Sequence, residues 1–423
     1  MTRSIKTKLE TIDKDHFSLL VDIGKIAKEE NLKAYLVGGM VRDLLLGFNN
    51  LDIDIVIESN AHKLANALVS RFSNCELSAK HDRFHTAKII FTIDGKKISI
   101  DLASTREETY EHPAALPTVN VSDLQKDLYR RDFTINALAV SLLPDDFGKI
   151  VDLFSGLNDL ENKKIKILHD LSFIDDPTRI IRAVRFAVKL GFEIEEHTKK
   201  LLFEAINSEQ FDNLIEKIRG DRVKIEIRYL LNLPSIQEAI KEFYNSGIHR
   251  MVSTSLRSND KLLNLKLDKK HKSENSWLLY LGIILKDLNN TDQEQIMKNL
   301  QMTNDEIKII TNGLKAYKIL EISENTNSIT LFKTLKELSS ESILITKLLF
   351  STNNKILALI DEYIEKTSKI KLEITGQDLI LMGLTEGRKL GETLNLILEM
   401  KIKNPNMKKE DEIAQAKILL MNH

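Results

Sequence analysis

Hydrophobic and polar residues follow two different patterns along the chain. Over the first 165 residues, short runs with alternating apolar positions are interleaved with amphipathic segments of helical period. The expected strands cover 34–39, 51–58, 86–93 and 96–103, and the expected helices cover 16–30, 41–47 and 61–72. Asp94 and Gly95, between the last two strands, form a two-residue hairpin signal. This part of the chain is therefore predicted to be a small mixed α/β domain.

The C-terminal half has the pattern of helices. Beyond residue 235, Pro405 is the only proline. Apolar residues recur three or four positions apart, as at Ile296 and Leu300 and at Leu331 and Leu335. Such spacing is typical of helices that bury one face. We therefore expect this half to be all-helical.

Composition and charge narrow the classes of function. The 423 residues include 61 Lys or Arg and 62 Asp or Glu, for a formal net charge of -1. A basic surface over the whole chain is excluded, so any contact with nucleic acid must come from local patches. The single cysteine, Cys75, excludes an internal disulfide framework and a zinc site built from several cysteines. No apolar run reaches about 18 residues and no signal-peptide core is present, so we expect a cytoplasmic protein without a membrane partner.

Two carboxylates two residues apart are the first candidate for chemistry. Asp52 and Asp54 leave the same face of an expected strand, where they can hold a pair of Mg²⁺ ions. Asp101, at the end of a neighbouring strand, is a candidate third catalytic carboxylate. Solvated acids on an exposed strand would have the same pattern, and whether Asp101 takes part stays open.

The residues in front of these acids favour the interpretation as a metal site. Gly38 and Gly39 lie where a strand turns into a helix, so bare N–H groups and the positive helix end are available to a phosphate. Arg42, one turn further on, can add a charge-assisted hydrogen bond to the same phosphate. A phosphate cradle beside metal carboxylates indicates a nucleoside triphosphate with Mg²⁺.

Five stretches, in this order, resemble the motifs of one family. LVGGMVRDLLLG followed by LDIDIV resembles the first motif of the class II tRNA nucleotidyltransferase and bacterial poly(A) polymerase family, a branch of the polymerase beta superfamily. RRDFTINALA (130–139) resembles its ribose-binding motif, and DLFSGLNDL (152–160) the motif that links head to neck. DDPTRIIRAVRF (175–186) resembles its base-reading motif, and GDRVKIEI (220–227) a helical motif of the neck. ITGQDLILMGLTEGRKLGETL (374–394) is similar to a segment of the tail.

The resemblance implies an α+β fold with three parts. These are a nucleotidyltransferase-type mixed α/β head at 1–150, a helical neck that recognises the base at 151–235, and a helical body and tail that bind tRNA at 236–423. It implies template-independent addition of CMP and AMP, from CTP and ATP, to the 3′ end of tRNA, with release of pyrophosphate and Mg²⁺ as cofactor. The implied partners are the tRNA acceptor arm and 3′ end together with CTP and ATP, and no protein partner is implied.

Base selection can be argued from the chemistry of two residues. Asp176 precedes Pro177 at an expected helix start, and Arg179 follows one turn later. A carboxylate only accepts hydrogen bonds and a guanidinium only donates them. The pair therefore fits the amino group and ring nitrogen that cytosine and adenine share, whereas uracil and guanine have the opposite polarity. Acids that merely cap a helix would give the same sequence.

Neighbouring residues complete the candidate nucleotide site. Arg182 and Arg185 continue the stripe at a spacing of three, either as nucleotide ligands or as a solvated face with salt bridges. By resemblance, Arg131 binds near the phosphates, and Asp132 binds near the ribose or supports the pocket. The base-reading motif begins with Asp175 where the family usually has Glu, which bears on how the helix is anchored.

Lysine-rich stretches at 256–272 and 401–409 are candidate contacts to RNA phosphates. The candidates carried forward are Lys269, Lys270 and Lys272. A solvated helix in a lysine-rich chain would have the same composition.

The motifs identify the family better than the member. Addition of CCA, of CC alone or of A alone stays open, because these activities share one active site. The stretch 104–120 has mixed charge, two prolines and no period, so we expect a loop of about 17 residues. By resemblance this loop helps to switch specificity from C to A. A poly(A) polymerase is disfavoured because the chain ends near neutrality, and an inactive RNA-binding protein is disfavoured by Asp52 and Asp54.

Overall fold

The computed structural model describes residues 4–109, 111, 117–208, 218, 220–258, 275–323 and 326–421. The chain forms two compact units, Met1–Thr254 and Ser255–His423. Across these described ranges, no helix is both long enough and apolar enough to span a membrane. The domain boundaries expected near 150 and 235 stay predictions.

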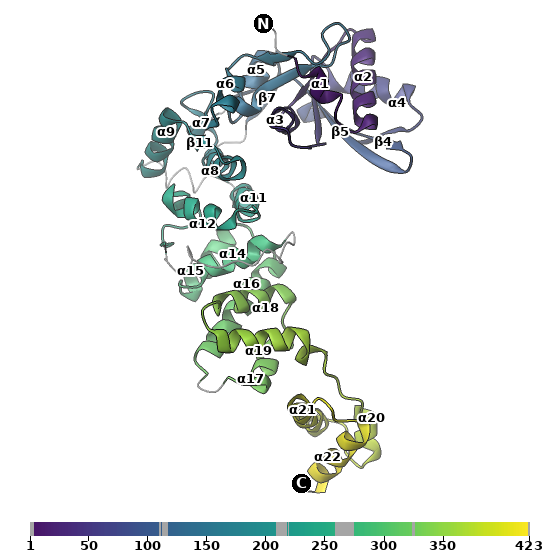
Figure 1. Cartoon of the computed structure of the whole chain (residues 1–423), viewed down its shortest axis with the longest axis vertical. Coiled ribbons are helices and arrows are strands. Elements are labelled where there is room, and N and C mark those ends of the chain that lie inside the picture. Colours follow the sequence, from purple (N-terminus) through teal and green to yellow (C-terminus); the bar gives the residue numbers. More distant parts are fainter. Residues whose placement is uncertain are drawn as a thin grey trace. The chain divides into compact units, whose positions relative to one another are not determined.

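A mixed sheet forms the N-terminal part of the first unit (Figure 1). Its strands are Lys33–Val37 (β1), Ile53–Glu58 (β2), Cys75–His81 (β3), Thr86–Ile93 (β4), Lys96–Ser104 (β5), Leu138–Ser141 (β8) and Ile150–Asp152 (β9). Within the described residues they lie in the order β3-β4-β5-β2-β1-β8-β9. β2 and β5 are parallel, and the other neighbouring pairs are antiparallel. The predicted strands and the hairpin turn at Asp94-Gly95, where both residues have positive φ, are confirmed.

The two faces of this sheet differ in how they are covered. The helices Lys14–Glu29 (α2) and Ala61–Arg71 (α4) pack against one face, and Ile98, Ile100 and Leu102 of β5 are buried. On the other face, Leu124–Tyr129 (α5) packs on β1, β2 and β8. The intervening β5 positions Ser99 and Asp101 remain exposed, so the β3-β4-β5 part of that face is open.

The expectation of a plain loop at 104–120 is wrong in part. Arg106–Thr109 (β6) and Thr118–Val121 (β7) pair as an antiparallel two-stranded sheet. Residues 110 and 112–116 lie outside the described part of the chain. β6 is polar on both faces, and β7 alternates over only four residues, with Val119 and Val121 on one face, so the hydrophobic pattern is too short to predict a strand.

The rest of the first unit is mainly helical. Its remaining helices and strands are Lys6–Leu9 (α1), Gly39–Leu46 (α3), Gly156–Glu161 (α6), Lys164–Ile165 (β10), Ser172–Asp175 (α7), Thr178–Leu190 (α8), Glu193–Ile194 (β11), Glu196–Asn207 (α9), Gly220–Leu231 (α11) and Ile236–Asn245 (α12). α8 contacts α7, α11, α12, β10 and β11, so it is the central helix of this part. Its buried positions Ile180, Ile181 and Val184 account for that packing.

The second unit is helical throughout the residues described. Its helices are Ser276–Leu285 (α14), Asn290–Asn299 (α15), Asn304–Glu321 (α16), Ser328–Leu335 (α17), Ser340–Leu349 (α18), Asn354–Glu365 (α19), Gly376–Leu381 (α20), Arg388–Lys403 (α21) and Lys409–Met421 (α22). α14 is buried along its whole length, Trp277 included, and contacts α16 and α18. The α+β class and the helical C-terminal half are confirmed.

A buried charge holds the end of the second unit together. Glu412 of α22 is 0% exposed and accepts hydrogen bonds from the backbone N–H groups of Glu373 at 2.8 Å and Ile374 at 2.9 Å. It also pairs with Lys401 of α21, which is itself buried. Lys401 is therefore not a solvent-exposed contact for RNA phosphates, because its charge is satisfied by an acid eleven positions later across the helix pair.

We predict that Glu412→Ala lowers the free energy of unfolding of this region by about 3–5 kcal/mol, because it leaves the backbone N–H groups of Glu373 and Ile374 without their acceptor and leaves the buried Lys401 only its ion pair with the exposed Glu373. Urea unfolding followed by circular dichroism measures this. The control is Glu392→Ala, which removes an exposed i, i+4 ion pair with Arg388 on α21 and should leave the midpoint unchanged. Equal midpoints for the two variants would show that the buried ion pair does not stabilise this region.

Candidate active site

The turn between β1 and α3 brings bare backbone next to a carboxylate. Gly38 has φ +75° and ψ -142°, a conformation that residues with a side chain rarely adopt. A Cβ added there would lie 3.4 Å from Oδ2 of Asp54 and 3.7 Å from Nη1 of Arg131. The turn therefore keeps an open space bordered by an acid and a guanidinium, as a phosphate and its metal would need.

Carboxylates and a lysine form a row across three neighbouring strands. Asp54 of β2 is in register with Asp101 of β5, and Asp101 is in register with Lys88 of β4. Lys88 Nζ lies 3.1 Å from Asp101 Oδ2. Partial desolvation, and then the like charge of Asp101, raise the pKa of the Asp54 carboxyl above its ordinary value, although its side chain still reaches solvent. Added positive charge at this point would stabilise the ionised form.

Asp52 occupies a different position from the one expected. β2 begins at Ile53, so Asp52 lies just before the strand, exposed, with its N–H donating to Asn50 Oδ1 at 3.0 Å. In the described ranges, no three acidic, histidine or cysteine side chains converge as a ready metal site. Asp54, with Asp52 before it and Asp101 beside it, still fits a divalent cation, because hard cations take oxygen ligands and a cation would offset the desolvation and the like charge that raise the pKa of Asp54 despite Arg131 and Lys88 nearby.

Asp43 is a site residue that sequence reasoning missed. It is buried on α3 and accepts from Arg42 Nε at 2.7 Å and from Asn50 Nδ2 at 2.8 Å. Arg42, also buried, donates its Nη1 to Asn136 Oδ1 at 2.6 Å. Asp43 thereby orients Arg42, the predicted phosphate ligand. Through its hydrogen bond with Asn50, it also holds the segment that leads to Asp52. The sequence feature that could have revealed Asp43 is an acid inside a short apolar helix.

All nine predicted nucleotide-binding residues line one pocket of about 550 Å³. Eight of its lining side chains are basic and three are acidic, so the pocket suits a polyanion. The predicted residues are Gly38, Gly39, Arg42, Arg131, Asp132, Asp176, Arg179, Arg182 and Arg185. The further charged or amide residues are Glu108, Arg130, Asn136, Lys189 and Arg222.

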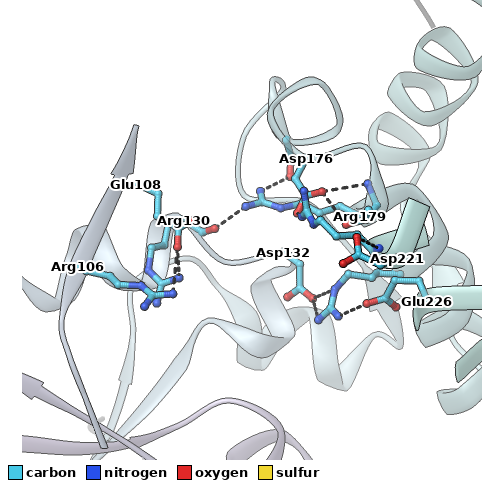
Figure 2. Close-up of polar contacts among 12 residues, drawn as sticks. Arg106, Glu108, Arg130, Asp132, Asp176, Arg179, Asp221 and Glu226 are labelled. Carbon is cyan, nitrogen blue, oxygen red and sulfur yellow. Dashed lines mark hydrogen bonds and ion pairs between the residues drawn. The ribbon is translucent and has the colours of Figure 1, made fainter. Parts of the chain in front are cut away.

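Asp176 and Arg179 present the expected acceptor and donor (Figure 2). Asp176 Oδ1 accepts from the backbone N–H of Thr178 at 3.1 Å, so it does cap α8, and its Oδ2 accepts from Arg222 Nη2 at 2.7 Å. Arg179 donates to Ser172 Oγ at 2.8 Å and to the carbonyl of Arg130 at 2.6 Å. Both side chains are thus held in place while keeping hydrogen-bonding capacity.

Arg182 and Arg185 are engaged by buried acids. Arg182 contacts Asp132 Oδ2 at 2.6 Å and Glu226 Oε1 at 2.8 Å, and Arg185 Nε contacts Glu226 Oε2 at 2.9 Å (Figure 2). Burial alone would raise the pKa of Asp132, but Arg182 and the amide of Asn136 outweigh it and hold that pKa below its ordinary value. The salt-bridge interpretation of these two arginines therefore holds, inside the pocket rather than on a solvated face.

Glu226 ties α11 to α8 through this network. We predict that Glu226→Ala lowers the free energy of unfolding of the first unit by about 3 kcal/mol, because two guanidinium groups lose a buried partner. Urea unfolding followed by circular dichroism measures the loss. Glu204→Ala, which removes an exposed ion pair with Lys200 on α9, is the control and should have little effect.

Fluorescence of Trp277 supplies an internal check, since the only tryptophan lies in the second unit. In Glu226→Ala, the midpoint of the unfolding transition followed by Trp277 fluorescence should equal that of the wild type. A wild-type circular dichroism midpoint would mean that the ion pairs of Glu226 are dispensable for stability.

The β6-β7 hairpin is anchored beside this pocket by Asp127 of α5. Asp127 is 0% exposed, and its carboxylate accepts from Arg130, from Arg131 and from the backbone N–H of Arg106. Arg130 also reaches Glu108 of β6 at 2.8 Å. The sequence marked 104–120 as a candidate functional segment, and the structure places its described part next to the residue whose carbonyl holds Arg179.

The RNA-binding candidates Lys269, Lys270 and Lys272 lie outside the described residues. In the second lysine-rich stretch, Lys409 lies 3.6 Å from Asp378.

Comparison with known proteins identifies relatives over the whole chain. Residues 34–166 match the Poly A polymerase head domain family, and residues 269–415 match the tRNA nucleotidyltransferase domain 2 family. An A-adding tRNA nucleotidyltransferase of Geobacter sulfurreducens is 32% identical over 94% of this chain and 46% of its own length. The chain spans about half the length of the A-adding relatives it matches. A CCA-adding enzyme of Ligilactobacillus salivarius is 29% identical over 96% of this chain and 97% of its own length.

Solved structures agree with this relationship. A CCA-adding enzyme in an apo form is 31% identical with a TM-score of 0.82, and the match covers 100% of both chains. The Thermotoga maritima CCA-adding enzyme in complex with tRNA is 29% identical with a TM-score of 0.78 over 99% of both chains. The chain therefore belongs to the class II tRNA nucleotidyltransferase and poly(A) polymerase head family.

Proposed function

We propose that the chain is a template-independent nucleotidyltransferase that adds CMP and AMP, from CTP and ATP, to the 3′ end of tRNA. One observation carries the proposal. The backbone turn at Gly38, which fits a phosphate, and the pair Asp176 and Arg179, which fits the shared edge of cytosine and adenine, line the same pocket. A nucleotide can engage both ends of this pocket, and the protein can then select its base without a template strand.

In this proposal, Asp52 and Asp54 hold Mg²⁺, with Asp101 as the third carboxylate. The metal, when bound, neutralises charge on the attacking and leaving oxygens of an in-line displacement. The turn at Gly38 and Gly39 and the guanidinium of Arg131 position the phosphates. The 3′-hydroxyl of the RNA attacks the α-phosphate, a new phosphodiester bond forms, and pyrophosphate leaves.

The remaining pocket residues position these groups. Asp132, held by Arg182 and Asn136, faces the ribose or supports the pocket. Arg222 pairs with Asp176 at 2.7 Å and holds its carboxylate aimed at the amino group of the base. A site whose polar groups would be left unpaired rejects a base of the wrong polarity by about 10⁴-fold or more. Solved relatives have been captured with tRNA, with CTP and with ATP, which supports the proposed substrates.

A second candidate is addition of the terminal A alone. The observation that favours it is the identity of the A-adding relatives, 32–37%, against 27–31% for the CCA-adding relatives and solved structures. The hairpin β6-β7, which we expect to bear on the switch from C to A, does not distinguish these candidates.

The test incubates the protein and Mg²⁺ with tRNA transcripts that end before the first C, before the second C or before the terminal A, each with one labelled NTP. CMP addition to the first two and AMP addition to the third is the expected result. AMP addition to the third transcript alone would assign the A-adding activity. Long A tails on every transcript, or no addition at all, would contradict the proposal.

A further inference from the structure

A pocket of about 860 Å³ lies on the side of α8 that faces away from the nucleotide pocket. Four α8 residues line it at the i, i+3, i+4 and i+7 spacing of one helix face, namely Val184, Ala187, Val188 and Gly191. The α8 arginines line the nucleotide pocket from the opposite face of the helix. The two pockets share no lining residue in the described chain, and we call the larger one the back pocket.

The floor of the back pocket is apolar. Val184, Phe192 and Leu202 are buried there, and the aromatic side chain of Phe203 on α9 is 38% exposed. At Gly191, which ends α8, no neighbouring side chain of the described residues lies within 4 Å of the position that a Cβ would take. The volume falls within the range of about 300–1,000 Å³ that is typical of small-molecule sites. An aliphatic chain can therefore lie against this floor.

Acidic side chains reach the back pocket from two separate elements. The segment that joins β11 to α9 contributes three glutamates and α12 contributes two, and both β11 and α12 pack on α8. These glutamates are Glu193, Glu195, Glu196, Glu238 and Glu242. Lys164 and Lys199 also line the pocket, so acids outnumber lysines by five to two. This balance favours a cationic ligand.

The lysines of the back pocket do not neutralise all of its acids. Glu193 pairs with Lys164 at 2.6 Å. Glu196 and Glu242 form no ion pair with any other residue that the structure describes, and Glu242 Oε1 accepts a hydrogen bond from Asn245 Nδ2 at 3.3 Å. One carboxylate on the α9 side and one on the α12 side are therefore available to a ligand that carries two positive charges.

We propose that the back pocket binds an aliphatic di- or polyamine. The methylene chain lies on the apolar floor, one ammonium group pairs with Glu196, and another pairs with Glu242. The exposed ring of Phe203 offers a further contact to an ammonium group. An inorganic cation would leave the apolar floor unused, and an anion would be repelled by the excess of carboxylates. The inference goes beyond the proposed function and does not depend on it.

The test titrates spermidine into the full chain and follows binding by isothermal titration calorimetry. RNA and nucleotides are left out because amines bind their phosphates directly. Glu196→Gln and Glu242→Gln each remove one charge and keep the shape, whereas Ala187→Met fills the floor and keeps every charge. Glu204→Gln removes an exposed acid of α9 that does not line the back pocket, so it is the matched control. Butylamine, with a single ammonium group, is the matched ligand.

Spermidine should bind the wild-type chain at one site and at least about tenfold more tightly than butylamine, because only the polyamine reaches both acids. Each glutamine variant should weaken spermidine binding by about three- to tenfold, and the double variant by about the product of the two factors. Ala187→Met should weaken the binding of both amines. Glu204→Gln should keep the wild-type Kd, and the circular dichroism midpoints of all the variants should match.

Four results would overturn the inference. The first is the absence of saturable spermidine binding, and the second is wild-type affinity in all three back-pocket variants, which would place the amine at other acids. The third is an equal loss in Glu204→Gln, which would indicate unspecific attraction to surface charge. The fourth is a loss in Ala187→Met alone, which would make the back pocket a site for an uncharged apolar ligand. A chain that adds no nucleotide but shows the expected amine binding contradicts the proposed function and not the back pocket.

Discussion

Asp54→Ala should abolish nucleotide addition, with kcat reduced by at least about a thousandfold, while tRNA binding persists. Asp54 is the carboxylate that faces the bare turn at Gly38 and whose pKa is raised by desolvation and by Asp101. Losing it removes metal charge that acts on the transition state, which is worth several kcal/mol, and each 1.4 kcal/mol is about tenfold in rate. Single-turnover addition of labelled nucleotide measures the loss.

Matched variants separate this effect from misfolding. Asp54→Asn keeps the shape and removes only the charge, so it should be as inactive as Asp54→Ala. Glu58→Gln changes an acid on the same strand that pairs with Lys33 near the surface, and it should keep near-normal turnover. Because Asp54 carries unfavourable charge in the folded protein, its removal should not lower the melting temperature. Wild-type turnover in either Asp54 variant would remove this residue from the metal site.

Of the seven strands described in the head sheet, the sequence predicted four, β1, β2, β4 and β5, because their hydrophobic alternation is strong, whereas β3, β8 and β9 were not predicted. β4, expected at 86–93, spans Thr86–Ile93, and its turn to β5 follows from Asp94-Gly95. The polar hairpin β6-β7 escaped prediction, since its stability comes from ion pairs such as Arg130 with Glu108 rather than from a buried face. Hydrophobic periodicity indicates which side chains are buried. It therefore does not reveal elements that are stabilised mainly by ion pairs.

Candidate site residues can be named from the sequence where a residue acts through its own chemical type. Gly38, Asp54, Asp176 and Arg179 were predicted because a turn, a carboxylate and an acceptor–donor pair each have a recognisable pattern, and their roles stay predictions. Residues that act through another residue were missed. Arg222 matters because it holds Asp176, and that contact joins helices 46 positions apart in sequence. Four-residue spacing places Arg222 and Glu226 on one face of α11, but it names neither partner.

The fold also brings together buried ion pairs that the sequence did not specify. From the sequence, Lys401 is expected at the surface. In the fold it is buried and forms an ion pair with Glu412. Arg182 and Arg185 form ion pairs with Asp132 and Glu226 inside the pocket, and their binding of the nucleotide stays a prediction. Such outcomes depend on contacts between distant segments, which one sequence does not specify.

Arg179→Ala should reduce the use of CTP and ATP by about ten- to a hundredfold and raise the relative incorporation of UMP. In the proposed site, Arg179 would donate to the ring nitrogen that cytosine and adenine present, and a lost hydrogen bond to a charged group is worth about 1.5–3 kcal/mol. Uracil has an N–H at that position, so it is relieved of a clash between donors when the guanidinium is removed. The measurement is kcat/KM for CTP, ATP and UTP on one tRNA acceptor.

Ser172→Ala separates base reading from support of the helix. Ser172 is buried and accepts from Arg179 Nη1 at 2.8 Å, so its truncation loosens the guanidinium without deleting it. That variant should lower kcat/KM modestly and by a similar factor for all three nucleotides, because the donor is still present. In Arg179→Ala the ratio of UTP to CTP use must change by more than in Ser172→Ala. If both variants lower the three values by one common factor, Arg179 is a structural arginine that bridges Ser172 and the Arg130 carbonyl, and the base is selected elsewhere.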